Sequence, residues 1–174
     1  MHTCYLETEL HLPYISGFLA FREVDPLMKL LAQVKDEQPD LMPQIVLVDG
    51  NGILHPRMCG IACHLGIVAN IPTIGVAKSF LVIPGAPSMK QIKEKCRQEL
   101  MKRGDHFLLS GSNDITFGAA LRTTDAAPNP VFVSQGHRVS LETCVRIVLA
   151  CSRFRVPEPI RRADLDSRAH IRHL

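Results

Sequence analysis

Apolar and polar residues are arranged along the chain in blocks that predict strands alternating with helices. Residues 45–48 form the run Ile-Val-Leu-Val, which is typical of a strand buried on both faces, and residues 73–77 predict a second short buried strand. Residues 115–122 and 131–134 predict two more strands, joined by a proline-containing loop. Residues 6–12 alternate between apolar and polar and therefore predict a half-buried strand.

Helical spacing of apolar residues separates these strands. Ser88 and Ser140 stand where a side chain can cap the first turn of a helix. Helices are predicted over residues 25–37, 60–69, 88–103 and 140–154, with a short last helix after Pro157 and Pro159. The alternation predicts one mixed α/β domain without internal repeats.

Composition agrees with a globular chain that buries a core. The chain has 174 residues, of which 46% are hydrophobic and 21% charged, and its net charge is +3. Its basic residues concentrate near the carboxyl end, which suits either a phosphate backbone or an ordinary solvated helix. These residues are Arg153, Arg155, Arg161, Arg162, Arg168, His170, Arg172 and His173.

The six cysteines show neither a CxxC pair nor a spacing with histidine that is typical of zinc sites. Reduced and mostly buried thiols are therefore expected, in an intracellular compartment. We find no cleavable leader and no apolar run as long as a membrane span. The sequence predicts a cytosolic or nuclear protein that does not enter membranes.

The buried strand at residues 45–48 runs directly into Asp49 and then Gly50-Asn51-Gly52. In open α/β sheets, ligands bind at the carboxyl ends of strands, and glycine lets the backbone approach a ligand closely. Asp49 is therefore the first candidate for chemistry. A strand followed by an ordinary Asp-Gly turn explains this motif equally well.

Several long motifs together resemble endonuclease V in order and spacing. The resemblance divides the chain into a divergent segment, residues 1–12, and an endonuclease V-like catalytic domain, residues 13–174. The matching motifs are Pro13-Tyr14-Ile15-Ser16-Gly17-Phe18-Leu19-Ala20-Phe21-Arg22-Glu23, Val48-Asp49-Gly50-Asn51-Gly52-Ile53-Leu54-His55-Pro56-Arg57, Gly60-Ile61-Ala62-Cys63-His64-Leu65-Gly66, Gly75-Val76-Ala77-Lys78, Gly136-His137-Arg138 and Arg155-Val156-Pro157-Glu158-Pro159-Ile160-Arg161-Arg162-Ala163-Asp164.

The resemblance implies a ribonuclease H-like fold and metal-dependent hydrolysis of nucleic acid on the 3′ side of inosine. It makes Glu23 and Asp49 ligands of Mg²⁺ or Mn²⁺, which prefer hard oxygen donors. It assigns Lys78 and His137 to water or phosphate at the same sheet edge, and Asp164 to a supporting role beside the metal. Taken singly, these residues have simpler interpretations: Glu23 as a first-turn glutamate, Lys78 as a lysine that extends into solvent and His137 as a hydrogen-bonded loop histidine.

The same resemblance implies a wedge that fills the gap left when a modified base leaves the stack. Tyr14 would stack in that gap with Ile15 beside it, and Ser16 stands where bacterial members carry proline. Other positions match the lining of the hypoxanthine pocket, although each glycine among them also suits a simple turn. These positions are Gly17, Leu19, Gly50, Gly52, His55 and Gly60.

One departure from the family concerns the metal site. Endonuclease V carries a first metal-binding aspartate on a central strand well upstream of the wedge, and residues 1–12 contain no aspartate. The chain is therefore expected to lack that strand, as an N-terminally shortened member, to bind Mg²⁺ weakly and to cleave poorly.

The resemblance is closer to vertebrate-type members, which favours inosine in single-stranded RNA over deoxyinosine in DNA as the substrate. It also implies a monomer in the cytoplasm and the nucleus, including the nucleolus. Two alternatives stay open: a non-catalytic module that binds inosine-containing nucleic acid, and an unstable fragment without function.

Overall fold

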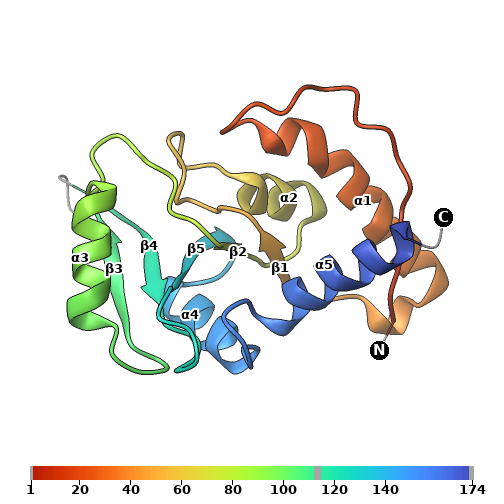
Figure 1. Ribbon diagram of the computed structural model, residues 1–174. Coiled ribbons are helices and arrows are strands. Elements are labelled where there is room, and N and C mark those ends of the chain that lie inside the picture. Colours follow the sequence, from red (N-terminus) through yellow and green to blue (C-terminus); the bar gives the residue numbers. More distant parts are fainter. Residues whose placement is uncertain (1, 112–114, 173–174) are drawn as a thin grey trace.

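A single five-stranded mixed sheet forms the centre of the molecule (Figure 1), in a computed structural model that describes residues 2–111 and 115–172. The strand order is β1-β2-β5-β4-β3, in which β1 and β2 are parallel and the other neighbours are antiparallel. The strands are β1 (Val46–Asp49), β2 (Thr73–Ala77), β3 (His106–Ser110), β4 (Thr116–Leu121) and β5 (Val131–His137).

Helices cover both faces of this sheet, and the element order confirms the expected α/β class. They are α1 (Leu19–Glu37), the short 3₁₀ helix η1 (Pro39–Leu41), α2 (Ile61–Ala69), α3 (Met89–Glu99), α4 (Leu141–Ala150) and α5 (Glu158–Ile171). Figure 1 shows α3 beside β3 at one end of the sheet and α1 with α2 near β1 at the other. None of the helices in the described ranges is long and apolar enough to cross a membrane.

Side-chain alternation along the strands divides the core into two layers. On β5, Val131 and Val133 pack in the cluster that includes residues of α4 and Ile160 of α5, whereas Phe132 between them points to the cluster under α3. A third cluster joins α1 and α2 to β1 through Val24, Leu65 and Val48. The central strands are therefore buried on both faces, which explains their uninterrupted apolar runs.

Two predicted helix caps are confirmed. The Ser88 hydroxyl accepts a hydrogen bond from the amide of Gln91, whose side chain in turn accepts one from the Ser88 amide, so a complete capping box begins α3. The Ser140 hydroxyl likewise accepts a hydrogen bond from the Thr143 amide at the beginning of α4.

The predicted strand at residues 6–12 is wrong: the segment has no strand pairing, and Leu10 and Leu12 are exposed. Glu7 of this segment contacts His170 of α5 instead, as does Tyr5 just before it, so the alternation had no sheet face to bury against. Conversely, β3 was missed. Its Phe107 and Leu109 are buried on alternate positions, but the exposed Leu108 between them hides the pattern.

Several boundaries also differ from the predictions. Helix α1 begins at Leu19 and passes through Pro26, because Ala20 and Val24 gain burial against α2. Helix α3 ends at Glu99, β5 continues to His137, and the last helix is a full 14 residues.

Candidate active site and nucleic-acid pocket

Asp49 and Lys78 meet at one edge of the sheet. Asp49 is the last residue of β1, and Lys78 follows the last residue of the parallel strand β2, so both stand at carboxyl ends of neighbouring strands. The Lys78 Nζ donates a hydrogen bond to Asp49 Oδ2 at 2.7 Å. Both side chains are 40–48% exposed, so the pair contributes little to stability and its groups are accessible to a substrate.

Glu23 lies on α1 next to Val24, which packs in the same cluster as Val48 of β1. Burial raises the pKa of the Glu23 carboxyl, the Arg22 charge opposes that shift, and the Asp49 carboxylate raises the pKa further. Glu23 lies beyond the first turn of α1, so the helix dipole does not explain its place. Two carboxylates therefore repel each other across this site, which is the electrostatic setting that a divalent cation relieves.

The glycine loop after Asp49 is joined to β5 through its main chain. The Gly52 amide donates to the Ser134 hydroxyl at 2.8 Å, and the Ile53 amide donates to the Gln135 carbonyl oxygen at 2.8 Å. A Cβ on Gly52 would overlap the Gln135 carbonyl oxygen, so glycine is needed here for close backbone approach. The Gly52 amide is used within the protein, which favours a structural over a base-reading role for this residue.

A tight turn positions the wedge segment at the pocket mouth. The Phe18 amide donates to the Ile15 carbonyl at 2.9 Å, and Gly17 adopts a φ of +81°, which suits the third position of a type II turn. The buried His55 shares a hydrogen bond of 3.0 Å with the Gly17 carbonyl, and the Arg57 guanidinium donates to the same oxygen. His55 thus holds the turn in place through its hydrogen bond to the Gly17 carbonyl oxygen.

A pocket of about 510 Å³ connects this turn to the sheet edge, a volume within the usual range of ligand sites. Of the predicted binding residues, it is lined by Tyr14, Gly17, Leu19, Gly50, His55 and Gly60, together with Asp49 and Lys78. Ile15 and Gly52 are not part of its lining. The Tyr14 side chain is 69% exposed at the rim, as a stacking residue requires.

Sequence reasoning missed several polar or aromatic residues of this pocket, among them Asn51, Arg57, Phe21 and His64. The Asn51 Oδ1 atom is buried without a hydrogen-bond partner among the described residues, so it offers an acceptor to a ligand. Arg57 lies 3.9 Å over the Phe18 ring, and the exposed Phe21 ring meets His64 edge-on at 5.6 Å. All four lie inside or beside the quoted motifs, but only packing shows which ones face the cavity.

The structure does not bring His137 to this edge. His137 pairs with Thr73 at the beginning of β2, whereas Lys78 comes five residues later, roughly 16 Å away at about 3.3 Å per residue. The expected placement is wrong because β5 runs antiparallel to β2, so its carboxyl end lies at the opposite edge.

Asp164 lies on α5, which packs against β1, and its Oδ1 accepts from Arg168 Nε at 3.0 Å. Within the described residues, no group of three that includes Glu23, Asp49 or Asp164 brings its ligand atoms within 4.8 Å of one another. Among the described residues, the side-chain partner of Asp164 is Arg168, so no contact assigns it a role at the site.

The basic residues near the carboxyl end are largely engaged within the protein. Arg161 pairs with Glu158, Arg162 with Asp166 and Arg168 with Asp164, all along α5. Arg155 instead donates to the main-chain oxygen of Lys78, so it supports the strand end that carries the site lysine. His173 lies outside the described residues.

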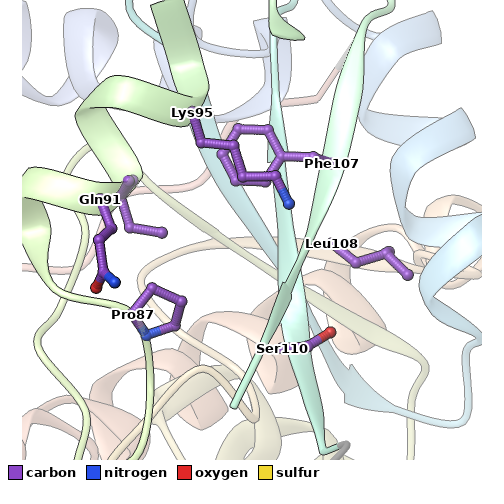
Figure 2. Close-up of a pocket in the computed structure, with 7 residues that line it drawn as sticks. Pro87, Gln91, Lys95, Phe107, Leu108 and Ser110 are labelled. Atoms are coloured by element: carbon purple, nitrogen blue, oxygen red, sulfur yellow. The ribbon is translucent and has the colours of Figure 1, made fainter. Parts of the chain in front are cut away.

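A second pocket, of about 360 Å³, lies between α3 and β3 (Figure 2). Lys95 extends over the Phe107 ring there, with Nζ 4.7 Å from the ring centroid. Among the described residues, this pocket is lined without a carboxylate by Pro87, Gln91, Ile92, Lys95, Phe107, Leu108 and Ser110. The pocket at Asp49, which has a carboxylate and an ammonium in its lining, is therefore the candidate for metal-dependent hydrolysis.

Acid is expected to loosen the wedge turn through His55. Burial lowers the pKa of His55, the Gly17 carbonyl opposes that shift, and the Arg57 charge lowers the pKa further. An unfolded histidine protonates near pH 6.5, whereas the folded one resists, so the free energy of unfolding should fall as the pH drops below about 6.5. When urea unfolding is measured at about pH 7.5 and about pH 5.5, the free energy of unfolding should fall less between the two in His55→Gln than in the parent. Equal losses would contradict this role.

The site residues lie in the part of the chain that matches known proteins. The endonuclease V family profile matches residues 1–165. The chain belongs to the endonuclease V family. Human Endonuclease V is 51% identical over 160 residues, which cover 92% of this chain and 56% of the human protein. The chain spans about half the length of its curated relatives, since it covers 48% of the mouse protein.

Solved endonuclease V structures share this fold. The crystal structure of human ENDOV superposes with a TM-score of 0.89 at 50% identity, covering 94% of this chain and 68% of the human one. The Ciona intestinalis enzyme superposes with a TM-score of 0.91 at 38% identity, covering 95% and 70% of the two chains. That enzyme was crystallised with a 24mer DNA containing an inosine followed by a ribo-adenosine. The mixed sheet flanked by helices is therefore the endonuclease V arrangement.

Proposed function

We propose that this endonuclease V chain recognises inosine in single-stranded RNA, or deoxyinosine in DNA, and hydrolyses the phosphodiester on its 3′ side with a divalent metal. One observation carries the proposal: Asp49 and Lys78 are hydrogen-bonded at the ends of neighbouring strands, in a pocket whose rim exposes Tyr14, and the Asp49 charge acts on Glu23 of α1. Family membership and the inosine-containing complex of the Ciona relative support it.

The donor set at this edge fits Mg²⁺ or Mn²⁺. Glu23 and Asp49 offer hard carboxylate oxygens, and the Asp49 charge adds to burial in raising the pKa of Glu23. When bound, such an ion supplies Lewis-acid charge that favours attack of water on a phosphodiester.

The protein side chains divide the remaining work. Lys78 is positioned by its hydrogen bond to Asp49 and by the hydrogen bond that Arg155 donates to its main-chain oxygen. Its ammonium can therefore contact a phosphate oxygen by charge. Tyr14 can stack in the place of the extruded base, while the Asn51 Oδ1 offers an acceptor inside the pocket. The turn held by His55 fixes the distance between wedge and pocket.

A direct test compares two single-stranded RNA oligonucleotides that differ by one inosine in place of guanosine. With the chain in excess and Mg²⁺ present, we expect inosine-dependent cleavage that stops when EDTA is added. Cleavage of both oligonucleotides at equal rates would overturn the proposed specificity. Cleavage of the same pair of oligonucleotides made as DNA shows whether RNA or DNA is the better substrate.

A non-catalytic inosine-binding module is the second candidate. It is favoured because no three acids that include Glu23, Asp49 or Asp164 gather within 4.8 Å in the described ranges, whereas the pocket is lined by Tyr14, His55 and the glycine loop as well as by Asp49. Inosine-selective binding without any cleavage by the parent chain would support this alternative.

Glu23→Gln is expected to stabilise the metal-free chain. The folded Glu23 has a raised pKa, so its charged form disfavours folding at neutral pH, and the difference vanishes at acid pH where the carboxyl is protonated in both states. We expect a gain of about 1 kcal/mol or less in EDTA at neutral pH, seen as a higher Tm. Glu9→Gln, on the exposed segment before the wedge, is the matched control. A lower Tm in Glu23→Gln would show that the carboxylate is structural.

A further inference from the structure

His2, Cys4 and Glu37 gather at a second place that can hold a metal. The Cys4 Sγ and His2 Nε2 atoms lie 2.9 Å apart, and His2 Nε2 lies 3.7 Å from Glu37 Oε2. All three ligand atoms lie within 4.8 Å of one another, a grouping that no other three such residues achieve in the described ranges. Glu37 ends α1, far in sequence from the other two, so spacing alone did not reveal the cluster.

The chemistry of the three ligands selects among metals. A thiolate, an imidazole and a carboxylate together suit Zn²⁺, whereas Mg²⁺ takes oxygen ligands alone. Zinc bonds of about 2.0–2.3 Å in a tetrahedron separate ligand atoms by about 3.3–3.8 Å. The separations of 2.9 and 3.7 Å lie close to that range, so small side-chain adjustments would complete the geometry.

The surroundings of the cluster also favour a cation. The Gln33 Nε2 donates to Glu37 Oε1 at 2.9 Å and so orients the carboxylate with its other oxygen toward His2. The cluster lies at the carboxyl end of α1, where the helix dipole attracts positive charge.

We propose that His2, Cys4 and Glu37 form a Zn²⁺ site, with water as the fourth ligand, that fastens the amino-terminal segment to α1. The same segment contacts α5, because the Tyr5 ring stacks on His170 at 4.3 Å and Glu7 lies 3.6 Å from the His170 imidazole. Figure 1 shows this segment passing the ends of both helices. The metal would therefore link the helix that carries Glu23 to the helix that carries Asp164.

Titration of Zn²⁺ alone into the metal-free chain, with an untagged amino terminus, tests this site. We expect one equivalent to bind with a micromolar or lower Kd, and Co²⁺ in its place to show the near-ultraviolet charge-transfer band of a thiolate ligand. Cys4→Ser should remove the band and weaken Zn²⁺ binding at least tenfold, and Glu37→Gln should weaken it similarly.

Matched controls separate this site from the sheet-edge site. His11→Ala in the same segment and Cys96→Ser on α3 should bind Zn²⁺ like the parent, and so should Asp49→Ala. Added Zn²⁺ should raise the Tm of the parent but not of Cys4→Ser. Zn²⁺ binding that Cys4→Ser leaves unchanged, or no stoichiometric binding by the parent, would overturn the proposal. Neither result depends on cleavage, so the proposed nuclease function is judged separately.

Discussion

Asp49→Ala is expected to abolish metal-dependent cleavage of an inosine-containing RNA while sparing most of the affinity for that RNA. Asp49 supplies one of the two carboxylates at the site and anchors the Lys78 ammonium at 2.7 Å. Its loss removes a metal ligand and releases the phosphate-binding charge, so the single-turnover rate should fall by about 10³-fold or more. Affinity, measured by fluorescence anisotropy, should change only a few-fold because Tyr14 and the pocket remain.

The protein itself should tolerate this substitution. The Asp49–Lys78 pair is largely exposed, and such pairs contribute about 1 kcal/mol or less to stability. Asp40→Ala, an exposed aspartate on η1, is the matched control and should cleave like the parent. Undiminished cleavage by Asp49→Ala would place the catalytic centre elsewhere, whereas a parent chain without activity would favour the binding module.

Gly52→Ala should destabilise the fold more than any other small change discussed above. The added methyl group would overlap the Gln135 carbonyl oxygen, and backbone atoms cannot move aside as a flexible side chain can. Relief requires that the loop leave β5, which breaks the hydrogen bonds of the Gly52 and Ile53 amides. We expect a loss of more than about 3 kcal/mol in the free energy of unfolding, or failure to fold.

Gly17→Ala is the comparison that isolates steric overlap from backbone strain. Gly17 adopts a positive φ of +81°, but the nearest atoms to a Cβ there are 3.6 Å away. Strain alone should cost about 1 kcal/mol. Equal losses in the two variants, measured by urea unfolding, would show that the overlap at Gly52 is relieved easily.

Local sequence signals predicted the elements whose cause is local. The run Ile45 to Val48 predicted β1 and placed Asp49 at its end, and Ser88 and Ser140 predicted the beginnings of two helices. The alternating segment at residues 6–12 shows the limit of such signals. A strand needs a partner with free backbone groups, and that segment packs along α5 instead.

The sequence by itself determined four of the strands (β1, β2, β4 and β5), the α-helices α1 to α5, the carboxylate at the end of β1 and the motifs of endonuclease V, because periodicity, capping and turn chemistry act between near neighbours. Only the tertiary structure decided which side chains share a site. The antiparallel pairing of β5 with β2 moved His137 to the far edge, and the packing of residues 2–7 between α1 and α5 brought Glu37 to His2 and Cys4. Strand direction and long-range packing depend on the whole chain, so no local pattern encodes them.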